Sequence, residues 1–161
     1  MFSDGGGPLA HPITVTVRIK RLAHGRADVA LPTRMTAEAA GFDLPAAVDK
    51  PLVLKPMEIR LVPCGFAMAI PKGFEAQVRP RSGLASKFGI TMINAPGTID
   101  SDYRGEVQVP LINLGSKKFT IERGMRIAQM LILPVPKAKL VEVEELDATK
   151  RGHRGFGHTG H

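Results

Sequence analysis

The chain has 161 residues and a mass of 17.3 kDa, which corresponds to one domain with a modest core. Hydrophobic residues make up 43% and charged residues 23%, a balance that excludes a largely disordered chain. The net charge of +7 favours polyanions: nucleic acid, an acidic membrane surface or a nucleoside triphosphate. One Tyr and no Trp leave little aromatic surface for stacking single strands, so nucleic acid is not the expected partner.

The single cysteine, Cys64, excludes an intrachain disulfide and a cysteine-rich zinc site, and favours a reducing compartment. The N-terminus has neither the basic start nor the apolar stretch of a secretory signal. An apolar run at Met130–Leu133 stops at Pro134, far short of the roughly 20 residues that a membrane helix needs. We therefore expect a cytoplasmic protein with no membrane partner.

Residues Ile13–Lys20 alternate apolar and polar with a period of two, which predicts a strand with its β-branched residues on one face. Similar runs recur along the chain, separated by Pro, Gly or charged turn residues. They predict strands at Leu52–Leu54, Glu58–Val62, Phe66–Ile70, Glu75–Val78, Val107–Asn113, Phe119–Ile121, Arg126–Leu133 and Leu140–Val143. One short helix is expected at Leu84–Phe88. Cys64 is expected in a turn between strands, as a small packing residue rather than a nucleophile.

Many short strands, 17 Gly, 13 Pro and almost no helical periodicity predict an all-β fold, a jelly-roll-like β-barrel. Residues 1–146 form the expected barrel domain, in which residues 1–11 are expected to be a disordered leader. From Asp147 onward the chain loses apolar residues except Phe156, so residues 147–161 are expected to form a flexible C-terminal arm. Oligomerisation is one way to cover the edge strands of so small a sheet.

The segment Arg79–Ala85 ends a predicted strand, turns on Pro and Gly, and opens the short helix. Such a turn can cradle a phosphate, because helix-start N–H groups, the Ser82 hydroxyl and the Arg81 guanidinium all donate to phosphate oxygens. Gly83 lets the backbone approach closely. Taken alone, the segment is more typical of a Ser-capped helix with solvated arginines.

The segment Asn94–Gly105 is interpreted as a hairpin bend that carries two carboxylates and the sole Tyr. A carboxylate beside a phosphate site can orient and deprotonate a water. Taken alone, Asp and Asn in a Gly-rich turn more often form Asx turns. If the segment is extended, Asp100 and Asp102 point the same way, and Ser101 and Tyr103 the other.

The segment Arg151–Gly160 is a basic, Gly-rich tail with one aromatic ring. It can close over a nucleotide, with Phe156 stacked on a base while Arg151 and Thr159 reach phosphates. Taken alone, a Gly-rich terminus is more often simply disordered.

These three segments, together with Ala40–Ala47 and Gly124–Met130, resemble in order the five motifs of the trimeric dUTPases. The resemblance runs from about Ala39 to Gly160. The strings Arg-Ser-Gly-Leu-Ala and Gly-Thr-Ile-Asp-Ser-Asp-Tyr-Arg-Gly are too long to expect by chance. The resemblance implies Mg²⁺-dependent hydrolysis of dUTP to dUMP and pyrophosphate, which lowers dUTP and supplies dUMP for dTMP synthesis. It also implies a homotrimer whose sites are shared between subunits, so that a monomer is inactive.

The resemblance assigns chemical roles within the hairpin. It makes Asp100 the general base for a water that attacks the α-phosphate in line. It places Tyr103 against the deoxyribose, where the ring leaves no room for a 2′-hydroxyl. Main-chain groups of the hairpin are expected to pair with the uracil edge, and the fit excludes the thymine methyl. The hairpin residues assigned in this way to substrate binding are Asn94, Gly97, Thr98 and Ile99.

The same resemblance assigns the phosphate and metal contacts. Arg81, Ser82 and Gly83 match the phosphate-binding motif, and Gln129 matches a residue near the phosphates and the subunit boundary. Asp43 matches the acidic residue that holds Mg²⁺ indirectly, through water. Since Mg²⁺ keeps several of its waters, the triphosphate is expected to supply the direct contacts.

In the tail, the resemblance places Phe156 on the uracil ring and Arg151 on the γ-phosphate, with Gly157 also in contact with substrate. The tail departs from the family pattern at Arg154, where Gly is common, and at His158, where Ser is common. Of the carried-over hydroxyl contacts, only that of Thr159 is kept.

Two alternatives stay open. A dCTP deaminase shares the fold and a similar Arg-Ser turn, but such relatives carry Trp where Tyr103 stands and a catalytic Glu in the next strand, whereas Val107–Leu114 contains no carboxylate. A non-catalytic basic trimer that binds nucleic acid or protein through its arms is favoured by the charge of +7 but not by the complete set of site residues.

Overall fold

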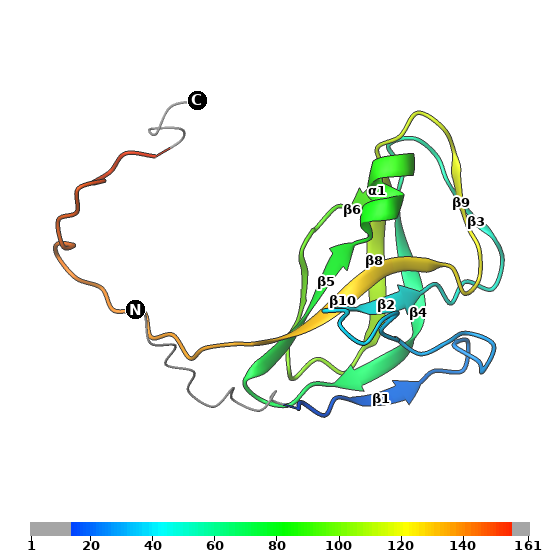
Figure 1. Cartoon of the computed structure of the whole chain (residues 1–161), viewed down its shortest axis with the longest axis horizontal. Coiled ribbons are helices and arrows are strands. Elements are labelled where there is room, and N and C mark those ends of the chain that lie inside the picture. Colours follow the sequence, from blue (N-terminus) through cyan, green and yellow to red (C-terminus); the bar gives the residue numbers. More distant parts are fainter. Residues whose placement is uncertain (1–13, 156–161) are drawn as a thin grey trace, which may run out of the picture.

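The computed structural model of the chain describes residues 14–155. Within that range the fold consists of two four-stranded sheets, a two-stranded ribbon and one short helix (Figure 1). The strands are β1 (Arg18–Arg21), β2 (Phe42–Pro45), β3 (Leu52–Leu54), β4 (Ile59–Ala69), β5 (Phe74–Pro80), β6 (Ile90–Met92), β7 (Gly97–Ile99), β8 (Glu106–Asn113), β9 (Phe119–Ile121) and β10 (Arg126–Pro134), and the helix is α1 (Ser82–Phe88). The sheet orders are β1-β4-β8-β6 and β2-β10-β5-β7, and β3 pairs with β9.

One hydrophobic core joins the two four-stranded sheets. Every second residue of β8, namely Val107, Val109 and Leu111, is buried, and Ala76 and Val78 of β5 follow the same period. This is the alternation of strands that face a core on one side. The expected all-β, jelly-roll-like fold is confirmed, and its sheets are open rather than closed into a barrel.

The first predicted strand is shorter than the sequence pattern indicated. Val15 and Val17 are half-buried and their polar neighbours exposed, as the alternation predicts, but pairing begins only at Arg18. Arg18 lies opposite Ala69, the last residue of β4, so the preceding residues have no partner strand in this sheet. Ile13 lies outside the described residues.

The two strands predicted on either side of Cys64 form one continuous strand, β4. The expected turn is a β-bulge instead, because Pro63 lies opposite Gln108 and Ala67 opposite Glu106, leaving three residues of β4 facing one of β8. Gly65, in the middle of the bulge, has a φ of 74°, which glycine adopts without strain. Cys64 is buried, as expected for a packing residue.

The strand predicted at Leu140–Val143 is wrong. Residues 135–155 carry no strand, and the side chain of Leu140 is 96% exposed. No strand of the described part of this protomer lies beside the segment to take its backbone hydrogen bonds. The chain instead leaves β10 as an extended arm that runs away from the sheets (Figure 1).

The short helix begins two residues earlier than predicted, at Ser82. The residue before the helix is Arg81, with an extended backbone (φ −88°, ψ 127°) and no side-chain hydrogen bond to the first turn. The interpretation of a Ser-capped helix is therefore wrong. Three short strands, β2, β6 and β7, were not predicted from the sequence.

Candidate functional site

A cavity of about 290 Å³ opens at the hairpin that contains β7. Five residues predicted for the site line it: Asn94, Thr98, Ile99, Asp100 and Tyr103. The structure therefore brings the proposed base and the proposed sugar-packing ring to one wall. Gly97, which also belongs to the predicted set, is buried in β7 opposite Val78 of β5.

Asp100 directly follows β7 and begins a tight turn. The Tyr103 N–H donates to the Asp100 carbonyl at 3.2 Å, which closes that turn. The segment is therefore not extended, and the expectation that Asp100 and Asp102 point the same way on that basis is wrong. Of these two exposed carboxylates, only that of Asp100 lines the cavity.

The Tyr103 ring is held in place by its own turn. Its hydroxyl donates to the main-chain carbonyl of Glu106 at 3.0 Å. The ring lies over Gly105, where a Cβ would be only 2.3 Å from the hydroxyl oxygen, so any larger residue would displace it. The ring stays 46% exposed and can still contact a ligand.

The predicted phosphate turn lies at the other end of β5. Ser82 and Gly83 are exposed in the first turn of α1. Arg81 reaches across to β10, where its Nη1 donates to the Arg126 carbonyl at 3.0 Å. The Gln129 amide donates to the Pro80 carbonyl at 3.1 Å, which ties the same turn to the middle of β10.

Asp43 lies opposite Gln129 in the β2–β10 pair. Its Oδ2 accepts a hydrogen bond from Arg126 Nη1 at 2.9 Å, and Arg81 Nη2 lies 3.6 Å from the same oxygen. Asp43, Arg81 and Gln129, three residues predicted to serve the phosphates and metal, are thus gathered at one sheet end. Arg126 belongs with them, although the sequence interpretation did not assign it.

The acidic side chains at this sheet end are too few to coordinate a metal ion by themselves. Within residues 14–155 no group of three or more His, Cys, Asp or Glu side chains could hold one. Asp43 offers a single carboxylate, and one of its oxygens is engaged by two guanidiniums. This donor set fits a Mg²⁺ ion that arrives on a triphosphate and contacts Asp43 through water, and does not fit an all-protein cage.

Asp100, at the end of the hairpin strand β7, lies far from the phosphate turn within one protomer. Ile99, just before Asp100, lies opposite Ala76, whereas Arg81 follows Pro80 at the far end of β5. The five or so intervening residues at about 3.3 Å each separate the two groups by roughly 15–20 Å. The lining of the hairpin cavity accordingly contains no residue of the phosphate turn.

The tail is described only in part. Arg151 is exposed, and its Nε donates to the Arg154 carbonyl at 2.9 Å. Phe156, Gly157, His158 and Thr159 lie outside the described residues.

Glu106 is a second residue near the site that the sequence interpretation missed. It is the first residue of β8, one position before the predicted start at Val107, so this strand does carry a carboxylate. Glu106 lines the hairpin cavity, and its Oε1 accepts a hydrogen bond from the Gly65 N–H at 2.9 Å and another from His24 Nε2 at 2.6 Å. The sequence signal that could have identified Glu106 was its position directly after Gly105, the last residue of the hairpin motif.

Cys64 and Asp28, which lie outside the cavity lining, have pKa values far from their ordinary values. Burial, together with the negative charge of Glu106, raises the pKa of the Cys64 thiol to about 12, so this side chain is no nucleophile at neutral pH. Hydrogen bonds from Arg123 hold the pKa of the exposed Asp28 at about 2. In the described residues, no helix is both long enough and apolar enough to cross a membrane.

Comparisons with known proteins bear on the same residues. The family model described as dUTPase matches residues 27–160. A protein of Caulobacter vibrioides named deoxyuridine 5′-triphosphate nucleotidohydrolase is 58% identical over 153 residues, covering 94% of this chain and 98% of the relative. A protein of the same name from Methylocella silvestris is 58% identical over 148 residues, covering 91% of this chain and 92% of the relative.

The fold is also that of a solved dUTPase. The dUTPase of Staphylococcus bacteriophage 80alpha, in a structure with dUPNHPP, superposes with a TM-score of 0.80 at 27% identity, covering 91% of this chain and 99% of the phage chain. The family match spans far more than half of this chain and includes the hairpin, the phosphate turn and Asp43. The chain therefore belongs to the dUTPase family of nucleotidohydrolases.

Proposed function

We propose that this protein hydrolyses dUTP to dUMP and pyrophosphate, with Asp100 as the general base. The observation that carries the proposal is the shared cavity wall, where Asp100 stands beside the tyrosine that follows it in the turn. A carboxylate beside a bound triphosphate can take a proton from a water molecule and orient that water for attack on the α-phosphorus. The bond from α-phosphorus to the bridging oxygen then breaks, and pyrophosphate leaves opposite the attacking water.

Selection of the nucleoside rests on the rest of that wall. Tyr103 packs against the sugar and sterically rejects a 2′-hydroxyl. Asn94, Gly97, Thr98 and Ile99 surround the base, and their main-chain groups pair with the uracil edge. The main-chain groups of Gly97, Thr98 and Ile99 suit this task because the pairing of β7 with β5 fixes their orientation.

Binding of the phosphates uses the other end of β5. Arg81, Ser82 and Gly83 donate to phosphate oxygens, with Gln129 beside them. A Mg²⁺ ion held near Asp43 with the nucleotide would supply positive charge that offsets the repulsion between the phosphates and the attacking water. Asp43 would hold the ion through water, a role that its single carboxylate suits.

The complete site requires more than one subunit, and we propose a homotrimer. Two features support this. The base and the phosphate turn lie at opposite ends of β5 in one protomer, so a second chain must bring them together. The arm after β10 exposes apolar side chains, with Leu140 96% and Leu146 88% exposed, which calls for cover by another subunit. Residues 147–161 then close over the nucleotide, with Phe156 on the base and Arg151, Gly157 and Thr159 near the phosphates.

The decisive measurement is pyrophosphate release from dUTP, dTTP, dCTP and UTP, each with and without EDTA. We expect rapid release from dUTP alone, and its loss in EDTA. Ammonia release from dCTP, or equal turnover of all four nucleotides, would overturn the proposal. Full activity in EDTA would overturn the role of Mg²⁺ only.

A further inference from the structure

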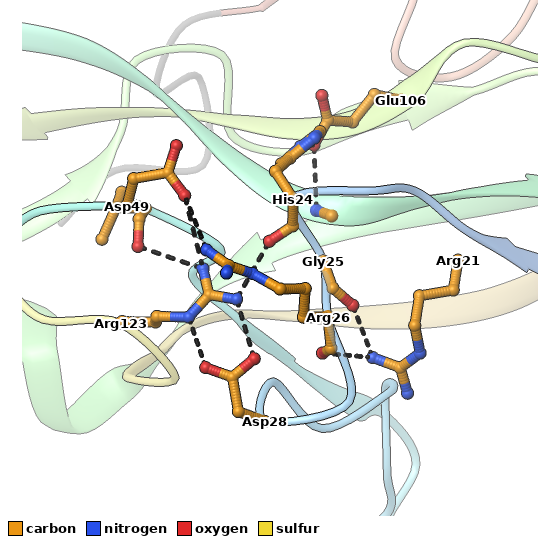
Figure 2. Close-up of polar contacts among 10 residues, drawn as sticks. Arg21, His24, Gly25, Arg26, Asp28, Asp49, Glu106 and Arg123 are labelled. Carbon is orange, nitrogen blue, oxygen red and sulfur yellow. Dashed lines mark hydrogen bonds and ion pairs between the residues drawn. The ribbon is translucent and has the colours of Figure 1, made fainter.

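The Glu106 carboxylate links the hairpin to a loop from the N-terminal part of the chain. His24 Nε2 lies 2.6 Å from Glu106 Oε1, and the two residues are 82 positions apart in sequence (Figure 2). Because an ionised carboxylate can only accept, the ring nitrogen of His24 must be the donor. The Glu106 side chain is 18% exposed and that of His24 36%, so the contact is partly shielded from water.

The β-bulge in β4 explains why a carboxylate is needed at this point. At Gly65 the ladder between β4 and β8 is interrupted, so the Gly65 N–H turns to Glu106 Oε1, which accepts it at 2.9 Å. The Gly65 carbonyl accepts from Leu22 N–H at 2.9 Å. Without the carboxylate, a buried backbone donor would be left without its partner.

The loop that carries His24 is itself firmly anchored. Gly25 crosses Gly65 so closely that a Cβ on Gly25 would lie 2.0 Å from the Gly65 carbonyl oxygen, so only glycine allows this crossing. Arg123 donates two hydrogen bonds to the Asp28 carboxylate, at 2.6 and 2.9 Å, and a third to the His24 carbonyl at 3.0 Å (Figure 2). The close crossing at Gly65 and the hydrogen bonds from Arg123 therefore fix the loop that carries the His24 ring.

The main chain of Glu106 in turn holds the tyrosine of the cavity. The Tyr103 hydroxyl donates to the Glu106 carbonyl at 3.0 Å, and the ring lies on Gly105 between them. Two hydrogen bonds to the side chain of Glu106 thus fix the residue whose carbonyl fixes the ring. A shift of Glu106 would be passed directly to Tyr103.

We propose that Glu106, held by His24 and the Gly65 N–H, is a positioning residue that sets the discrimination between deoxyribose and ribose through Tyr103. The inference rests on the proposed function, because it takes Tyr103 to be the group that contacts the sugar. The Glu106 carboxylate accepts from the bulge and the histidine, and its carbonyl accepts from the hydroxyl of the ring that we propose meets the sugar. Its removal loosens the ring while the residues of the chemical step stay in place.

The test is the selectivity ratio, defined as kcat/KM for dUTP divided by kcat/KM for UTP. In the full-length protein, Glu106→Ala is expected to lower this ratio about tenfold, mainly through a higher kcat/KM for UTP, because a loosened ring no longer excludes the 2′-hydroxyl. Glu106→Gln should keep most of the ratio, because a carboxamide Oε1 can accept from both donors. An unchanged ratio in the alanine variant, or an equal loss in both variants, would overturn the proposal.

A variant with a smaller perturbation guards against loss of folding in Glu106→Ala. His24→Ala removes one of the two hydrogen bonds and leaves the bond to Gly65. We expect the selectivity ratio to fall about fivefold, the equilibrium factor of one ordinary hydrogen bond. A folded His24→Ala protein with the parent ratio would contradict the part assigned to the histidine.

A double-mutant cycle separates positioning from general destabilisation. Tyr103→Phe removes the hydroxyl that bonds to Glu106, so the further change of Glu106→Ala in that background should alter the ratio less than about twofold. Independent, multiplicative effects of the two changes would show that Glu106 does not act through this hydroxyl.

Asp28→Asn is the matched control, because it weakens the Arg123 contact of the same loop and leaves the pair between His24 and Glu106 intact. It should lower thermal stability without changing the selectivity ratio. A changed ratio in this variant would mean that loosening of the loop alone is enough, and would overturn the specific role of Glu106. The proposed function fails separately, if the parent protein releases no pyrophosphate from dUTP.

Discussion

Asp43 and Arg126 form an ion pair across β2 and β10, with Arg126 Nη1 2.9 Å from Asp43 Oδ2. Arg81 Nη2 approaches the same oxygen at 3.6 Å. One carboxylate therefore ties the start of β10 to the turn that leads into α1. The side chain of Asp43 is only 16% exposed, so this ion pair is better shielded from water than an ordinary surface pair. The contacts with Asp43 hold Arg81 and Arg126 near the position proposed for the phosphates.

Asp43→Asn should raise the Mg²⁺ concentration needed for half-maximal activity and lower kcat/KM for dUTP about tenfold or more. The amide oxygen can still accept from Arg126, but the negative charge that attracts the hydrated metal is lost. Initial rates of pyrophosphate release across a Mg²⁺ series measure the effect. Asp49→Asn is the control, because Asp49 is exposed and its nearest guanidinium nitrogen, on Arg26, is 3.8 Å away. An unaltered Mg²⁺ dependence in Asp43→Asn would contradict its role.

Asp100→Asn should remove turnover while leaving nucleotide affinity nearly intact. Loss of a general base costs about 100- to 10,000-fold in rate, whereas the isosteric amide preserves the shape of the cavity. Calorimetric titration with dUpNHpp and single-turnover kinetics with dUTP separate the two quantities. Asp102→Asn, a change of the same kind at an exposed residue outside the cavity lining, should keep the parent rate. Full turnover by the Asp100 variant would reject this base.

A chain that ends at Lys150 should keep the trimer and lose on the order of a hundredfold in kcat/KM. The core and the sheets end at Pro134, well before the cut, so assembly does not need the removed residues. The closure over the nucleotide that we propose does need them. Light scattering after size exclusion reports the assembly, and pyrophosphate release reports the rate. A truncated trimer with parent activity would show that the tail has no part in closure.

Acid should selectively weaken the contact between Asp28 and Arg123. The folded pKa of Asp28 is about 2, below the value of about 3.9 for an unfolded aspartate, so its stabilisation is fully present above about pH 4 and is lost as the pH falls through about 2. The difference in Tm between the parent and Asp28→Asn should therefore be constant from pH 5 to 7. Between about pH 4 and 2 it should shrink. A difference that instead grows on acidification would contradict the direction of this pKa shift.

The Cys64 thiol should be inert in the native protein. With its pKa raised to about 12 and its side chain buried, it carries almost no thiolate at pH 8. A colorimetric disulfide reagent should react slowly under native conditions and at once in guanidinium chloride. Rapid reaction of the native protein would show that β4 opens readily at its bulge.

The period of two in the sequence was enough to identify most of the framework. The run from Val107 to Asn113 shows which residues face the core, because alternation is a local property of a strand and needs no knowledge of its partner. The hairpin and phosphate residues were predicted through the resemblance of their segments to the motifs of the dUTPase family, since each segment taken alone favoured an ordinary turn or cap. The strand predicted at Leu140–Val143 failed for the converse reason, since a pattern without a neighbouring strand forms no ladder in this protomer.

By itself, the sequence determined the all-β class and the family, and it predicted the residues that we propose contact the nucleotide. Only the tertiary structure decided where β1 begins, that β4 continues through a bulge at Gly65, and which charges meet. His24 reaches Glu106 across 82 positions, and Arg123 reaches Asp28 across 95. Such partners are chosen by the register of non-local strands, which depends on burying two complementary faces together, and no local run of residues carries that information.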